Sequence, residues 1–194
     1  VDLTDCFVRT AVPRLDIVPS NVDLSGAEIE LVEFGDRLHR LQQALTQPDS
    51  SQWDICIIDC PPSLGMLTLN ALIAAESLVV PMQCEFFALE GLSQLLTTVE
   101  RVRARFNADL SILGVALTMY DRRNRLTDQV ADDVRECLGP VVFETVIPRN
   151  VRLSEAPSHG LPALIYDHRC PGSAAYIALA RELIDRLPNI SEAA

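Results

Sequence analysis

The chain has 194 residues, against roughly 100 to 150 for a typical domain, so it is long enough to bury a sizeable core. Hydrophobic residues make up 48% of the sequence, which excludes disordered and low-complexity classes. The formal net charge is -11, so nucleic acid and anionic membranes are repelled on average. Binding to either would therefore need a local cationic patch.

All 16 basic side chains are arginine. Without lysine, these residues offer no Schiff-base chemistry and no lysine clamp of a phosphate-binding loop. The six cysteines include no C-x-x-C pair, so we interpret them as buried, reduced thiols of a cytoplasmic protein. We find neither a membrane-spanning apolar run nor a signal peptide. Because the first residue is not Met, we expect the sequence to be the later part of a longer polypeptide.

The first predicted elements are short. Leu15 to Val18 form a candidate strand, which Pro19 ends. Apolar residues recur every three or four positions between Ala27 and Leu45, which predicts one or two helices with a buried stripe. Residues 47–52 are polar and predict a loop.

A nearly continuous apolar run from Trp53 to Asp59 predicts a strand that is covered on both faces. Pro61 and Pro62 follow, and neither can donate a hydrogen bond to a sheet. Beyond them, the apolar pattern predicts a helix, a strand and a second helix, at residues 64–75, 77–81 and 89–106.

The second half of the chain continues this alternation. Strands are predicted at residues 112–119 and 141–147 and helices at 127–138 and 174–187, with Gly139-Pro140 as a helix stop. The alternation predicts an α/β fold: a doubly wound, mostly parallel sheet with helices on both faces, in a single domain. Ligands of such folds bind at the carboxyl ends of the strands.

Asp59 is the first candidate functional residue, because it stands at the carboxyl end of the most apolar predicted strand. Burial there disfavours a charge unless a cation or a hydrogen-bond network compensates it. A magnesium ion, bound directly or through water, would do so. The alternative is that Asp59 merely caps the following turn.

Four separated segments carry a family resemblance. They read DICIIDCPPSLG at 54–65, PMQCEFFALEGL at 81–92, LTMYD at 117–121 and VIPRNVRLSEAPSHG at 146–160. In this order they resemble the ParA/Soj family of chromosome-partitioning ATPases, and the similarity extends over about residues 25–187. The first segment is similar to the family's Walker B and switch region.

The resemblance implies a P-loop ATPase with a deviant Walker A motif, acting in chromosome partitioning or plasmid segregation. Such a protein dimerises around ATP and Mg2+, and the dimer binds DNA without sequence preference. A ParB/Spo0J-type centromere-binding protein stimulates hydrolysis, and the protein is cytoplasmic and associated with the nucleoid. The resemblance implies no membrane partner.

The family's phosphate loop and its lysines precede the region that is matched here. The 194 residues contain no G-x-x-x-x-G-K-[ST] motif. We therefore expect a P-loop NTPase-like domain that lacks its N-terminal phosphate-binding part and its catalytic lysines. The longer protein would be an ATPase, whereas these residues alone would bind ATP poorly and not hydrolyse it.

The resemblance also implies roles for single residues. Asp59 would be the Walker B carboxylate that helps to hold magnesium, and Pro61 would lie in the switch segment near the terminal phosphate. The residues that would line the adenine pocket are Thr118, Met119, Pro148, Arg149 and Asn150. From the residues alone, Thr118 and Met119 could equally be ordinary core at a strand end.

Local positive charge lies in the run Arg122-Arg123-Asn124-Arg125 and in the pair Arg149 and Arg152. Each arginine can neutralise one DNA phosphate, independently of base sequence. Arg123 and Arg152 match positions that contribute to DNA binding in the family. The alternative is a solvated surface loop.

Two other functions remain open. One is a MinD-type division-site ATPase that cycles on membranes, although its basic C-terminal helix has no counterpart in the acidic end of this sequence, SEAA. The other is a non-catalytic interaction module that naturally lacks the phosphate loop.

Overall fold

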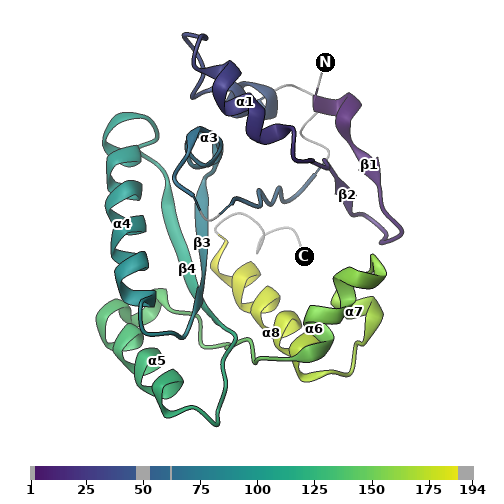
Figure 1. Ribbon diagram of the computed structural model, residues 1–194, viewed down its shortest axis with the longest axis vertical. Coiled ribbons are helices and arrows are strands. Elements are labelled where there is room, and N and C mark those ends of the chain that lie inside the picture. Colours follow the sequence, from purple (N-terminus) through teal and green to yellow (C-terminus); the bar gives the residue numbers. More distant parts are fainter. Residues whose placement is uncertain (1–2, 47–52, 62, 188–194) are drawn as a thin grey trace. The chain divides into compact units, whose positions relative to one another are not determined.

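The computed structural model describes residues 3–46, 53–61 and 63–187 (Figure 1). The chain folds as two compact units, the first made of residues 1–76 and 99–110, the second of 77–98 and 111–194. Each unit is considered by itself. The predicted loop at 47–52 lies outside the described residues.

The first unit begins with a short 3-10 helix, η1 (Leu3–Cys6), and two short strands. β1 (Val8–Arg9) pairs antiparallel with β2 (Asp16–Ile17), which confirms the strand predicted there. Two helices occupy the predicted helical stretch, α1 (Leu24–Leu31) and α2 (Arg40–Leu45), and α3 (Met66–Ala74) is the helix predicted after the prolines.

The strand predicted at residues 53–59 is wrong. The structure has no strand there, and Ile57 is 85% and Ile55 43% exposed. An extended segment becomes a strand only when a neighbouring backbone accepts and donates its hydrogen bonds, and no strand pairs with this segment within the described residues. For the same reason Cys56 and Cys60 are exposed rather than buried. Cys137, on the helix Arg125–Leu138, is also exposed, whereas Cys84 and Cys170 are buried as predicted.

Asn107 stabilises the end of α3 in this unit. Its side-chain amide donates to the carbonyls of Leu72, Ile73 and Ala75, at 3.1, 3.2 and 2.8 Å. These acceptors belong to the last turn of the helix, where intrahelical donors run out.

We therefore expect Asn107→Ala to destabilise the protein by about 1 to 2 kcal/mol, because the carbonyls lose their partner in a half-buried setting. Urea denaturation would measure the change in the free energy of unfolding. Asn21→Ala, in an exposed loop where the side-chain amide contacts the neighbouring Asp23, is the matched control. Equal midpoints for the two variants would contradict the assignment.

The second unit is built on two parallel strands, β3 (Ser77–Gln83) and β4 (Ser111–Thr118), paired from Ser77 with Ser111 to Gln83 with Thr118 (Figure 1). The register shifts by one residue between Leu78 and Val79. Both strands were predicted. α4 (Ala88–Arg105) connects them and α5 (Arg125–Leu138) follows, each within two residues of its predicted start. The core between these elements consists mainly of Val80, Met82, Leu92, Val115, Leu117, Val130 and Val134.

The other face of the pair is covered by the end of the chain. A short run of helical segments, α6 (Val151–Glu155), η4 (Ala156–His159) and α7 (Ala163–Tyr166), leads to α8 (Pro171–Arg186). A Cβ atom at Gly114 would clash with the ring of Phe143 and approach Arg186. Helices thus flank both faces of a parallel pair, which is the predicted doubly wound arrangement.

The strand predicted at 141–147 forms only in part. α5 ends at Gly139, with φ of 55°, as the Gly-Pro stop predicted, and η3 (Gly139–Val141) follows. Phe143 N–H then donates to Val115 and Ile147 N–H to Leu117, at 2.9 and 2.8 Å. Four residues therefore span two on β4, so the intervening backbone loops out of the ladder.

The looped-out backbone is satisfied by a side chain. The N–H groups of Glu144 and Thr145 donate to the two carboxylate oxygens of Glu182 on α8, at 2.7 and 3.1 Å. A bulge of this kind needs such an acceptor, because its donors have no strand to face. Glu182 thus supplies the acceptors that the looped-out backbone needs.

Candidate functional site

Asp59 ends the extended segment of the first unit. The segment is anchored at its start, where Trp53 stacks on Phe7 with centroids 4.0 Å apart and donates to Asp16 at 3.0 Å. Asp59 itself is exposed, which differs from its expected burial, and Pro61 is exposed in the turn that follows. A solvated carboxylate needs no compensating cation, so burial does not argue for a metal here.

Five predicted nucleotide-binding residues belong to the second unit, and two of them, Thr118 and Met119, lie at the end of β4. Thr118 is the last residue of β4, and its hydroxyl donates to the Met82 carbonyl on β3 at 3.2 Å. Met119, the next residue, adopts a φ of 53° and is 41% exposed. A left-handed conformation is uncommon for a side chain of this size, and such strain clusters at functional sites.

The loop at 148–150 lies beside this strand end. Tyr120 pairs with Pro148 in a parallel bridge: Tyr120 N–H donates to Ile147 and Arg149 N–H donates to the Tyr120 carbonyl, each at 3.0 Å. The Asn150 oxygen then accepts Arg152 N–H at 2.9 Å and caps α6. The structure therefore brings Thr118, Met119, Pro148, Arg149 and Asn150 together at the carboxyl end of β4.

Tyr120 is a residue of this edge that the sequence did not single out. Its hydroxyl makes a short hydrogen bond to Asp128 in the first turn of α5. That bond raises the pKa of Tyr120 above its ordinary value of 10.0, with smaller contributions from burial and from the Asp128 charge. The phenol stays neutral at physiological pH and ties the start of α5 to the strand end.

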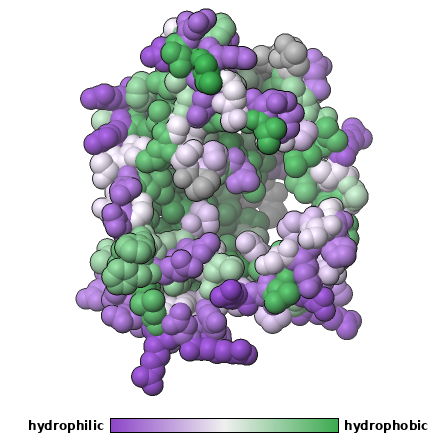
Figure 2. Space-filling model, in the orientation of Figure 1, coloured by the Kyte–Doolittle hydropathy of each residue, from purple (hydrophilic) through white to green (hydrophobic). Residues whose placement is uncertain are grey.

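Arginines surround the same edge. Arg122 and Arg123 are exposed in the turn between β4 and α5, and Arg125 is exposed at the first position of α5. The Asn124 oxygen caps this helix by accepting Leu126 N–H at 3.1 Å. Arg149 is also exposed. At the bottom of the view in Figure 2, hydrophilic side chains cover this turn. Asn124 and Asn150, which cap α5 and α6, fix the backbone next to these arginines.

Arg152 differs from the other arginines. It forms ion pairs with Glu155 at 2.9 Å and with Asp167 at 3.6 Å. The Glu155 hydrogen bond, followed by contributions from Tyr166 and from the Glu155 charge, raises the pKa of Arg152 above its ordinary value. The spacing of Arg152 and Glu155, three residues apart on a helix, was a signal of this pair.

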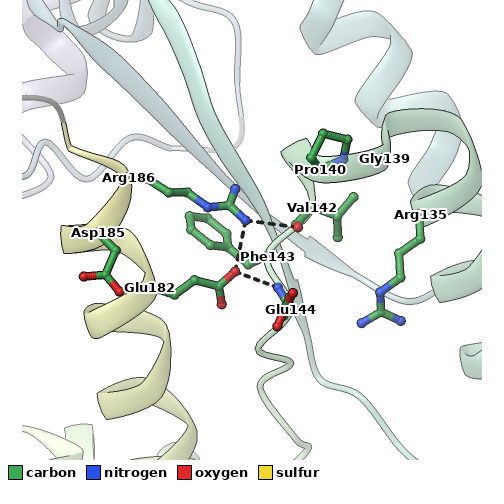
Figure 3. A pocket seen from close by; sticks show the side chains of 9 residues that line it. All are labelled: Arg135, Gly139, Pro140, Val142, Phe143, Glu144, Glu182, Asp185 and Arg186. Carbon is green, nitrogen blue, oxygen red and sulfur yellow. Dashed lines mark hydrogen bonds and ion pairs between the residues drawn. The ribbon is translucent and has the colours of Figure 1, made fainter.

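A cavity of about 640 Å³ is lined by residues of α8, of the end of α5 and of the segment 139–144, and it is not part of this edge (Figure 3). Arg186 and Glu182 of α8 point toward Phe143 and Glu144 on one wall, and Arg135 of α5 lies on the other. Two of its charged side chains are paired: Glu182 accepts from Arg186 at 3.0 Å and also from the Glu144 N–H at 2.7 Å. None of the predicted site residues lines it.

The donors present fit ATP and Mg2+ only in part. Mg2+ takes one or two carboxylates and completes its shell with water and phosphate oxygens, so a single exposed Asp59 is chemically suitable. Within the described residues no group of three metal-binding side chains exists, which excludes a metal cage made by these residues alone. The phosphates would need the lysines and glycine-rich loop that the 194 residues lack.

Comparisons with known proteins place the chain among ATPases. The AAA domain family model matches residues 1–112. The chain is 55% identical over 185 residues to a chromosome partitioning protein ParA of Caulobacter vibrioides, covering 95% of this chain and 69% of that protein. It is 52% identical over 182 residues to the sporulation initiation inhibitor protein Soj of Bacillus subtilis, covering 94% of this chain and 72% of that one.

The solved structures of two other proteins are similar in fold to this chain. A Mycobacterium smegmatis protein described as cobyrinic acid a,c-diamide synthase, with bound ADP and magnesium, is 40% identical, with a TM-score of 0.70 over 78% of this chain and 61% of that one. The cell division ATPase MinD of Pyrococcus furiosus, 23% identical, has a TM-score of 0.76 over 96% of this chain and 72% of that one, which supports the fold alone.

Proposed function

Because the chain belongs to the ParA/Soj family of chromosome-partitioning ATPases, we propose that it is the Walker B, adenine-binding and DNA-binding portion of an ATPase that segregates DNA. The observation that carries this proposal is the strand edge of the second unit, where two separate loops meet beside exposed arginines. The relatives span more residues than this chain, so the phosphate loop is proposed to come from outside the 194 residues.

In this proposal the adenine lies at the carboxyl end of β4, in the second unit. Asp59 would hold magnesium through water, with Pro61 beside the terminal phosphate. Bound Mg2+ supplies neutralisation of the charge that develops on the phosphates. The Thr118-Met119 turn and the loop from Pro148 to Asn150 would enclose the adenine, to which backbone and amide groups offer donors and acceptors.

DNA would be bound by the arginines of the same edge, Arg123 and Arg152 foremost. One subunit of charge -11 attracts DNA weakly. Two subunits joined around ATP would present two cationic edges to one duplex, which raises the effective concentration of the second contact. This gives a physical reason for nucleotide-gated DNA binding. A ParB-type protein is the partner proposed to stimulate hydrolysis, in the cytoplasm and at the nucleoid.

The test uses the complete gene product that contains this chain. ATP hydrolysis, measured by phosphate release, should require Mg2+ and should rise when DNA and the cognate ParB-type protein are both added. DNA retention should require ATP and decline with salt. Phosphate release that is unaffected by magnesium chelation, or DNA retention that is independent of ATP, would refute the proposal.

Within the described residues, the structure contains no helix with the length and hydrophobicity of a membrane span.

Arg123→Glu should weaken DNA binding roughly tenfold at low salt and reduce the slope of log affinity against log salt by about 1. The reason is the loss of one phosphate contact and the gain of a repulsive charge. Fluorescence anisotropy with random-sequence duplexes at several salt concentrations measures both quantities. Arg181→Glu, an equal charge change at an exposed position of α8, is the control, and equal losses in both variants would show a mere net-charge effect.

A further inference from the structure

Arg152 is held by two carboxylates from different helical segments. Its Nη1 donates to Glu155 Oε2 at 2.9 Å, within α6, and its Nε lies 3.6 Å from Asp167 Oδ2, just beyond α7. The Arg152 side chain is 53% exposed, against 41% for Glu155 and 33% for Asp167. All three charges are therefore at the surface, within reach of a polyanion.

Both carboxylates are themselves held in position. Tyr166 donates its hydroxyl to Glu155 Oε2 at 3.2 Å, the same oxygen that accepts the guanidinium, and its ring stacks on His159 with centroids 4.8 Å apart. The other oxygen of Asp167 accepts Arg169 N–H at 3.1 Å, which leaves Oδ2 toward the guanidinium. Positioned partners lose less side-chain entropy on pairing than two mobile surface residues would.

We infer that Glu155 and Asp167 compete with DNA phosphate for Arg152 and thereby set the DNA affinity of this contact. The inference rests on the proposed function. A carboxylate and a phosphate offer a guanidinium the same chemistry, negatively charged oxygens that accept its N–H groups. A phosphate on Arg152 must displace or share these partners, and it also lies well within a Debye length, about 10 Å, of both negative charges.

Arg123 provides the internal comparison. None of the ion pairs found in the described part of the chain involves its guanidinium. Its backbone N–H, not its side chain, donates to Asp121 at 3.0 Å. Arg123 is thus available to phosphate without competition, whereas Arg152 is restrained. The two carboxylates weaken the Arg152 contact, so that DNA bound without sequence preference can dissociate.

The experiment measures DNA affinity of the complete gene product with ATP and Mg2+, using random-sequence duplexes at several salt concentrations. Glu155→Gln with Asp167→Asn removes both charges and keeps side-chain size. We expect roughly threefold to tenfold tighter binding and a salt slope steeper by up to about 1. Asp132→Asn with Glu136→Gln, exposed on α5, changes the net charge equally and is the matched control.

The same double change is also made in an Arg152→Met background. There the gain in DNA affinity should fall to that of the control, because the guanidinium for which carboxylates and phosphate compete is absent. Tyr166→Phe, which frees Glu155 without changing charge, should give a smaller gain. A double variant that binds no tighter than the control, or a gain that persists without Arg152, overturns the inference while the proposed function stands. Loss of ATP-dependent DNA retention in the unmodified protein overturns the proposed function itself.

Discussion

Asp59→Ala should reduce the magnesium-dependent ATPase rate of the complete gene product by about 10- to 100-fold, the usual cost of removing a carboxylate that holds a metal through its outer shell. The fold should be unaffected. Asp59 is exposed, and none of the ion pairs in the described part of the chain involves its carboxylate. Phosphate release over a range of Mg2+ concentrations measures the rate and its metal dependence.

The control is Asp54→Ala, at the other end of the same extended segment. Its carboxylate pairs with Arg14 at 3.2 Å, with both side chains largely exposed, so its loss should alter stability little and turnover not at all. A rate lowered equally in the two variants would indicate a general effect of the segment. An unaltered rate in Asp59→Ala would remove the metal role from this residue.

Local pattern was sufficient to predict most helices and the strands β3 and β4. Each of these elements has its own period of apolar residues, and the core of the second unit lies on the faces that the pattern indicates. Residues 53–59 show the limit of this reasoning. Their apolar composition is suited to a buried strand, but strand formation depends on backbone partners that local composition does not specify.

The segment at 141–147 shows a second limit. Its β-branched residues favour a strand, yet the N–H groups of Glu144 and Thr145 donate to the carboxylate of Glu182, 38 residues away from Glu144 along the chain. The apolar pattern predicts the last helix at 174–187 but singles out no residue of it as a partner of this segment. Contacts of such separation depend on the tertiary packing of α8 and leave no periodic signal.

For the candidate site, the resemblance identified segments whose proximity the structure then describes. The pairing of Tyr120 with Pro148 brings the adenine-pocket residues of both loops to one edge. Their binding role stays a prediction. The carboxylates around Arg152 were missed because cationic residues were considered without their neighbours, although the spacing of Glu155 was visible in the sequence.

Arg186 fastens α8 to the sheet. Its guanidinium donates to the carbonyls of Leu113, Val141 and Val142 at 3.2, 3.1 and 3.2 Å, and to Glu182 at 3.0 Å (Figure 3). It also lies over the Phe143 ring, 4.1 Å from its centroid. The side chain is only 24% exposed, so these acceptors would be left largely without water if it were removed.

Arg186→Met should therefore destabilise the second unit by about 3 kcal/mol, since hydrogen bonds to a charged group are lost and Glu182 keeps an unpaired charge. Chemical denaturation measures the change. Arg181→Met, the same substitution at an exposed position of α8, should cost little. Similar losses for the two variants would mean that helix propensity, not the carbonyl contacts, explains the effect.

The stability that the Glu182 carboxylate contributes should depend on pH. Burial raises the pKa of Glu182, but the N–H groups of Glu144 and Thr145 and the Arg186 charge outweigh it, so that the pKa is lowered from its ordinary 4.5. A lowered folded-state pKa gives stability that is present above about 4.5 and is lost as pH falls through the folded value. In Glu182→Gln this part of the acid sensitivity should disappear. An unfolding free energy that declines equally steeply with acid in both proteins would contradict the role assigned to Glu182.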